Sequence, residues 1–127
     1  MPVVATPIFP QAPRQGVAVI STANTNRDGS GTIETVFLAG ANGSYIERID
    51  ICAAGTTTDG LVGLYLHNGS IAVLWREARI PAITPSASVP AFMRSTREWL
   101  FLPAGCSLRA STHKAEGFNV NAWGGDL

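Results

Sequence analysis

Few groups in this 127-residue chain could do acid–base or nucleophilic chemistry. A nucleophile needs a general base beside it, and the only histidines are His67 and His113. His67 precedes the turn Asn68-Gly69 and no Gly-x-Ser-x-Gly motif is present, so we expect a solvated turn residue rather than a base. His113 opens the segment 113–117 and is expected at a loop tip. We therefore predict that the chain is not an enzyme and has no catalytic residue.

Carboxylates are the other candidates, because a pair of them could hydrolyse a glycosidic bond. Five of the acidic residues fall in predicted strands beside arginines, which favours cross-strand ion pairs. These five are Glu34, Glu47, Asp50, Glu77 and Glu98. The stretch 26–31, NRDGSG, resembles half of a calcium loop but lacks the bidentate glutamate that ends such a loop. The sequence therefore predicts no metal site.

The two cysteines, Cys52 and Cys106, have no Cys-x-x-Cys spacing and no adjacent histidine. This spacing favours buried free thiols over a zinc site, a redox dithiol or a disulfide. No Gly-x-Gly-x-x-Gly or Walker motif is present, so no nucleotide cofactor is indicated. We expect no cofactor of any kind.

Charge composition argues against a polyanionic partner. Nine Lys+Arg balance nine Asp+Glu, so the formal net charge is zero and nucleic acid is a poor candidate. Only 14% of the residues are charged while 46% are hydrophobic, which favours a protein that assembles with other protein. Arginine outnumbers lysine eight to one, a bias that suits bidentate pairing at protein surfaces or reflects a GC-rich source.

The first sixteen residues predict an extended arm, because four of the eight prolines fall there, at Pro2, Pro7, Pro10 and Pro13. Val3, Val4, Ile8 and Phe9 give this arm an apolar character. It either packs on its own domain or a neighbouring subunit, or is a floppy terminus. Nothing in the sequence directs secretion or membrane insertion, so we expect no membrane partner and synthesis in a reducing cytoplasm.

From Val17 to Leu127 the pattern is short alternating runs separated by turn residues, with no run of helical periodicity. Asn68-Gly69 is the strongest hairpin signal, and Ile46 falls out of phase with Ile49, which predicts a bulge near Glu47. The expected strands are 17–22, 32–38, 44–54, 61–67, 71–79, a strand ending at 99–102, 106–112 and 118–123.

Between these strands, Pro81, Pro85 and Pro90 mark a long crossing from one sheet to the other. In the penultimate strand, Ser107, Arg109 and Ser111 are expected on the solvent side. About eight strands of this spacing predict one all-β domain over residues 17–127, an antiparallel β-sandwich or jelly roll with the arm 1–16 before it.

The segment 36–79 and the following turn Leu102-Pro103-Ala104-Gly105 with Cys106-Ser107-Leu108-Arg109 resemble small virion structural proteins of tailed double-stranded DNA bacteriophages. The turn Leu-Pro-Ala-Gly-x-x-Leu is similar to one in many phage jelly-roll and sandwich modules. The resemblance implies a non-enzymatic protein, either a decoration (cement) protein of the capsid or a component of the tail.

Our first hypothesis is a capsid decoration protein that assembles as a homotrimer in the virion and bridges capsomers by contacts with the major capsid protein. The expected assembly residues are Pro7, Ile8, Phe9 and Pro10 in the arm, with Trp123 near the C-terminus. The alternative is a tail or fibre module that binds a host-surface glycan through an exposed tryptophan. The three tryptophans, Trp75, Trp99 and Trp123, form either a stacking platform or parts of the core and interface.

Overall fold

The computed structural model describes residues 12–127, which form eight β-strands and no helix. The strands are β1 (Ala12–Ile20), β2 (Glu34–Leu38), β3 (Ser44–Ala53), β4 (Gly60–His67), β5 (Ala72–Ile80), β6 (Met93–Leu102), β7 (Ser107–Thr112) and β8 (Phe118–Asp126). Within these described residues there is accordingly no helix able to cross a membrane.

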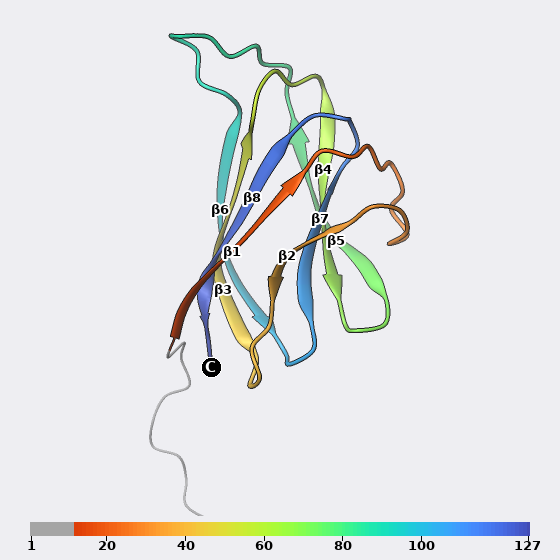
Figure 1. Ribbon diagram of the computed structural model, residues 1–127, viewed down its shortest axis with the longest axis vertical. Helices are drawn as coiled ribbons and strands as arrows, with labels where there is room; N and C mark the ends of the chain where they lie inside the picture. Colours follow the sequence, from red (N-terminus) through yellow and green to blue (C-terminus); the bar gives the residue numbers. More distant parts are fainter. Residues whose placement is uncertain (1–11) are drawn as a thin grey trace, which may run out of the picture.

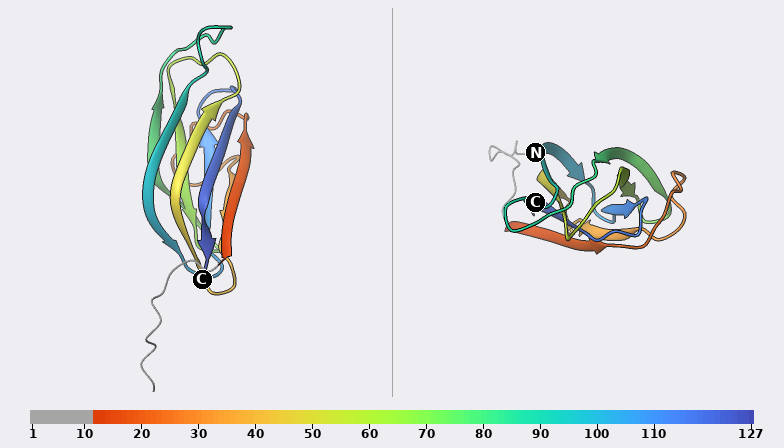
Figure 2. Two further views of the ribbon diagram at one scale, coloured as in Figure 1. Left: turned by 90° about the vertical axis from the view of Figure 1, so that its left-hand side faces the viewer. Right: turned by 90° about the horizontal axis from the view of Figure 1, so that it is seen from above.

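The strands form two four-stranded antiparallel sheets that face each other (Figure 1). Sheet 1 has the order β1-β8-β3-β6 and sheet 2 the order β2-β7-β4-β5. The left-hand view of Figure 2 looks onto the outer face of sheet 1. The strand pairs 1–8, 2–7, 3–6 and 4–5 are those of a long hairpin rolled up on itself, which is the jelly-roll arrangement. The predicted all-β sandwich is confirmed.

Alternation of side chains builds the core between the sheets. In β8, Phe118, Val120 and Ala122 are buried while the residues between them face outward. In β3 the alternation would put Ile46 and Ile49 on opposite faces. A bulge at Glu47 shifts the register against β8 between Ile46 and Arg48, and both isoleucines then face the core. Ile46 is thereby fully buried, as the predicted bulge requires.

Two predicted connections are confirmed. The β4–β5 hairpin turns at Asn68-Gly69, where Gly69 has a φ of +98°, a conformation that favours glycine. The segment 81–92 crosses from β5 in sheet 2 to β6 in sheet 1 and forms the tip at the top of Figure 1. This crossing is fastened where Thr57 Oγ1 donates to the carbonyl of Pro81 at 2.7 Å.

The predicted boundary between arm and body at residue 16 is wrong. Residues 12–16 belong to β1, which pairs with β8 from Ala12 onward. Pro13 is accommodated because β1 is an end strand of its sheet, hydrogen-bonded on one side only. At Gly16 the strand passes close to sheet 2. A Cβ at this position would lie 2.2 Å from the Val36 carbonyl oxygen, so the approach requires glycine. The expected arm anchors Pro7, Ile8, Phe9 and Pro10 lie outside the described residues.

The expectation of a solvent-facing row in β7 is also wrong in part. Ser107 and Ser111 are each only 1% exposed. The reason is that β7 lies inside sheet 2 and that the β1–β2 loop (residues 21–33) folds across the outer face of that sheet. Tyr65 of β4 is fully buried beneath this loop, and its hydroxyl donates to the carbonyl of Asn26 at 2.7 Å.

Candidate interaction surface

The outer face of sheet 1 is ordered in rows by the strand register. Residues paired across neighbouring strands share a face, so each row runs from β1 through β8 and β3 to β6. One row is Val17, Asn121, Asp50 and Ser95; a second is Val19, Asn119, Cys52 and Met93; a third is Gln15, Trp123, Arg48 and Arg97. The middle strands β8 and β3 carry mostly polar residues on this face, while the end strands β1 and β6 carry both polar and apolar ones.

Large apolar side chains are exposed along both edges of this face. On β1, Val17 is 62% and Val19 66% exposed, and we call this pair the β1 margin. On β6, Met93 is 66%, Trp99 78% and Phe101 44% exposed, and these three form the β6 margin. Exposed apolar residues aligned in this way are typical of a surface that contacts another protein.

Trp123 lies near the middle of the same face and is held by polar contacts. Its indole Nε1 donates to Asp50 Oδ2 at 2.9 Å, and the Arg48 guanidinium lies 5.2 Å from the ring centroid. Arg48 also pairs with Asp50 at 3.2 Å. A small hollow of about 150 Å³ opens beside the ring, lined by Glu47, Arg48, Arg97 and Trp123. The ring is thus fixed in orientation while 38% of the residue stays exposed.

The three tryptophans do not form one platform. Trp75 lies on β5 in sheet 2, where it packs partly against the core and has the Arg76 guanidinium 4.5 Å from its ring. Trp99 and Trp123 share the outer face of sheet 1, but β3 separates their strands. Alternation along β8 puts Trp123 on the face opposite Val120, but that this face is the outer one, and that Trp99 shares it, depended on how the strands pack.

The two histidines occupy different settings. Nδ1 of His67 accepts a hydrogen bond from the Gly69 N–H at 3.0 Å, as expected of a turn residue. His113 is not a free loop tip: its side chain is 13% exposed and its Nε2 lies 3.6 Å from Glu77 Oε2. Glu77 also accepts from Arg27 Nε at 2.7 Å, so His113 lies beside the Arg27–Glu77 ion pair that fastens the β1–β2 loop.

Most carboxylates on the strands pair with arginines, although not always with sequence neighbours, and Glu34 of β2 forms no ion pair within residues 12–127. Arg97 lies 4.0 Å from Glu47 across the β3–β6 pair, as expected. Arg76, however, pairs with Glu98 of the opposite sheet rather than with its neighbour Glu77. Sheet packing, which sequence spacing does not reveal, selects this partner.

In the calcium-like stretch, Asp28 bonds to the loop itself. Its Oδ1 accepts from the Ser30 backbone N–H at 3.0 Å and from the Ser30 hydroxyl at 2.5 Å. The hydroxyl bond, aided by the backbone bond, lowers the pKa of Asp28 from its ordinary value of 3.8. The carboxylate therefore stabilises a tight turn in the β1–β2 loop.

Cys52 and Cys106 are free thiols, but the expectation that both are buried is wrong. Each is partly exposed, because Cys52 points to the outer face of sheet 1 and Cys106 lies in the turn just before β7, against the edge of the core.

Neither a protein-family model nor a curated protein matches this chain.

Proposed function

We propose that this chain is a non-enzymatic structural protein of a tailed-phage virion, a decoration (cement) protein that binds the head surface and bridges capsomers. The proposal rests first on the two apolar margins of sheet 1, where Trp99 is 78% and Val19 66% exposed. Leaving such side chains in water is unfavourable, and their burial against protein contributes about 25 cal/mol for each Å² of apolar surface. A charge-poor chain with these margins is suited to binding protein rather than to chemistry.

The placement of the margins supports a ring-shaped homo-oligomer. The β1 margin and the β6 margin lie on opposite end strands of one sheet, so they are two different patches. A contact between the β1 margin of one copy and the β6 margin of the next is heterologous, and such contacts form a closed ring when the rotation between copies closes. A trimer, the state that we propose, is the smallest closed ring of this kind.

Capsid binding is the direct test. Purified protein should sediment with emptied capsids of the phage that encodes it. Truncation of residues 1–11, which leaves β1 intact, should reduce this binding if the apolar segment MPVVATPIFPQ is a strap. Failure of the full-length protein to sediment with such capsids would contradict the decoration role.

The oligomer is tested separately, by light scattering on the free protein. Val19→Ser and Trp99→Ser should each convert trimer to monomer. Val89→Ser is the matched control, because Val89 is also exposed, at 43%, but lies in the crossing segment between the sheets and outside both margins. A wild-type protein that is monomeric at high concentration would overturn the ring.

A second candidate, glycan binding by a tail or fibre module, has its own support in the Trp123 hollow. An indole fixed by Asp50, with charged groups around a space of about 150 Å³, could stack on a sugar ring while the polar groups bind its hydroxyls. Glycan-array binding that is lost in Trp123→Ala but retained in Trp99→Ser would favour this function over decoration.

A further inference from the structure

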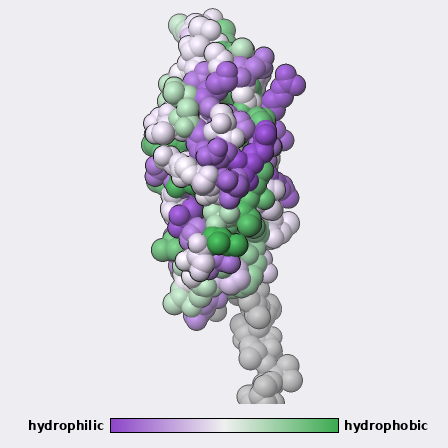
Figure 3. All heavy atoms as spheres, turned by 90° about the vertical axis from the view of Figure 1, so that its right-hand side faces the viewer, coloured by the Kyte–Doolittle hydropathy of each residue, from purple (hydrophilic) through white to green (hydrophobic). Residues whose placement is uncertain are grey.

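The outer face of sheet 2 carries a pocket that the proposed function does not use. It has a volume of about 340 Å³ and lies between the β1–β2 loop and the β4–β5 hairpin. Figure 3 looks onto this side of the molecule, where hydrophilic side chains gather on the upper half. Because the loop and the hairpin bound the pocket at both ends, it suits a compact ligand better than an extended peptide.

Arg109 of β7 is the only arginine or lysine side chain that lines this pocket. Six other arginines form ion pairs with carboxylates: Arg14, Arg27, Arg48, Arg76, Arg79 and Arg97. Arg109 has no such partner within residues 12–127, although it is partly buried. Its Nε donates to Ser107 Oγ at 3.0 Å, which positions the guanidinium and leaves both terminal nitrogens available for an anion.

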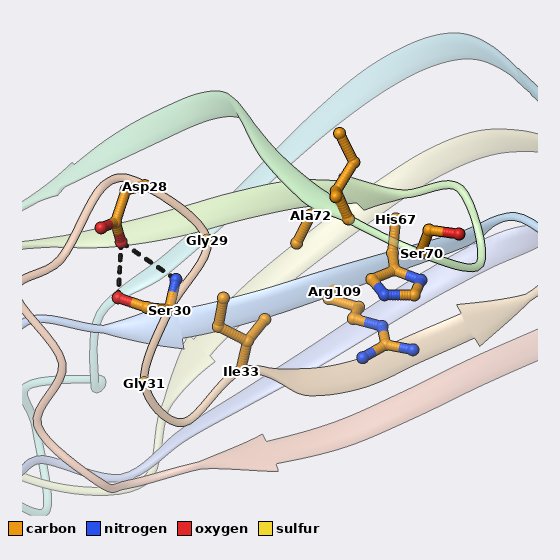
Figure 4. Close-up of a pocket in the computed structure, with 10 residues that line it drawn as sticks. Asp28, Gly29, Ser30, Gly31, Ile33, His67, Ser70, Ala72 and Arg109 are labelled. Carbon is orange, nitrogen blue, oxygen red and sulfur yellow. Dashed lines mark hydrogen bonds between the residues drawn. The ribbon is translucent and has the colours of Figure 1, made fainter.

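His67 adds a second donor beside this guanidinium. Since its Nδ1 accepts the Gly69 N–H at 3.0 Å, the proton of the neutral ring is on Nε2. In the close-up of Figure 4, the His67 ring and the Arg109 guanidinium lie next to each other, with Ser70 of the hairpin nearby. Two donors and a hydroxyl thus meet at one end of the pocket.

The other end of the pocket limits the charge of a ligand. Asp28 lies there, and its carboxylate turns toward Ser30 and away from Arg109 (Figure 4). Its lowered pKa keeps this group negative at neutral pH. A ligand with one negative charge at the Arg109 end meets less repulsion from Asp28 than a phosphate monoester, which carries about two charges into the same space.

The remaining lining suits the body of a sugar. Ile33, Ile71 and Ala72 offer an apolar wall, and Ser70 offers a hydroxyl. A pyranose presents C–H groups on its faces and hydroxyls at its rim, so both kinds of surface would be used. A carboxylate alone would leave most of the 340 Å³ unfilled.

We infer that this pocket is a binding site for an acidic sugar, with the sugar carboxylate held by Arg109 and His67. The site lies on sheet 2 and the apolar margins lie on sheet 1, so the site is independent of the proposed assembly role. An experiment can therefore disprove the sugar site without disproving the assembly role, and the reverse.

The test is a titration of the full-length, ¹⁵N-labelled protein followed by NMR, with three probes. Glucuronate should shift the amide signals of Arg109, Ser70 and the hairpin in a saturable way. Glucose, the neutral match, and acetate, the carboxylate without a ring, should each bind at least about tenfold more weakly. No shift with glucuronate, shifts confined to another face, or equal binding of either control probe would overturn the inference.

Variants of the pocket test which side chains bind the sugar carboxylate. Arg109→Gln should weaken glucuronate binding about tenfold or more, since a charge-assisted hydrogen bond is lost. Arg94→Gln is the matched control, because Arg94 is an exposed arginine of β6 outside the pocket and also forms no ion pair within the described residues. If Arg109→Gln fails to fold, which its own spectrum reveals, His67→Gln provides the second variant and should weaken glucuronate binding. Unchanged binding in a folded Arg109→Gln or His67→Gln variant contradicts the site.

Discussion

Arg76 of β5 and Glu98 of β6 form an ion pair between the two sheets. These strands are the last of their sheets, so the pair links sheet 1 to sheet 2 along the edge of the sandwich. The Glu98 side chain is 7% exposed while that of Arg76 is 53% exposed. A carboxylate at this depth depends on its partner, because an unpaired buried charge is costly.

Arg76→Ala should therefore lower the free energy of unfolding by about 1–3 kcal/mol, as measured by urea denaturation. The matched control is Arg79→Ala, since Arg79 pairs with Asp59 at 3.8 Å and both side chains are largely exposed. The control should change stability by less than about 0.5 kcal/mol. Equal effects in the two variants would show that the buried Glu98 does not need Arg76.

Tyr65→Phe tests how the β1–β2 loop is held on sheet 2. The variant removes the hydroxyl that donates to the Asn26 carbonyl at 2.7 Å from a fully buried ring. We expect a loss of about 1 kcal/mol and faster amide hydrogen exchange in residues 21–33. Tyr45→Phe is the control, because the Tyr45 hydroxyl has no hydrogen-bond partner within residues 12–127 and should be nearly neutral. Unchanged amide hydrogen exchange in residues 21–33 of the Tyr65→Phe variant would mean that other contacts hold the β1–β2 loop on sheet 2.

Gly124→Ala tests the close approach of β8 to β3. A Cβ at Gly124 would lie 1.8 Å from the Tyr45 carbonyl oxygen, so the backbone must move. We expect destabilisation of more than about 3 kcal/mol by thermal or urea unfolding. Gly55→Ala, where a Cβ meets nothing within 4 Å, should be neutral or stabilise by up to about 1 kcal/mol. A native-like melting temperature for Gly124→Ala would contradict the described strand pairing.

Asp28→Asn tests the charge in the loop turn through its pH dependence. Because the folded-state pKa of Asp28 is below 3.8, the wild-type carboxylate contributes stability above that pH, and the contribution is lost as pH falls through the folded pKa. The asparagine retains an oxygen acceptor for Ser30 but has no charge. Wild type should thus be more stable than the variant at about pH 6, and the difference should shrink as the pH falls below 3.8. A difference that stays constant with pH would show that the charge contributes nothing.

Much of the fold follows from patterns of residue type that are contained within single short segments of the sequence. Alternation places Val120 and Trp123 on opposite faces of β8, and the conformational demand at Gly69 produces the β4–β5 turn. The bulge at Glu47 is also readable, because Ile46 can be buried with Ile49 only if one residue is inserted between two rows. The sequence by itself thus determined the all-β class, the main turns and the approximate number of strands, but not where β1 and β6 begin.

Contacts between distant segments depended on the tertiary structure. Pro13 enters a strand because β1 has a free edge, and Ser107 is buried because β7 lies inside sheet 2. His67 and Arg109 meet because β4 pairs with β7 in a register that places both on the outer face. Strand order and the course of the β1–β2 loop decide these contacts, and both result from packing over the whole domain rather than from any local pattern.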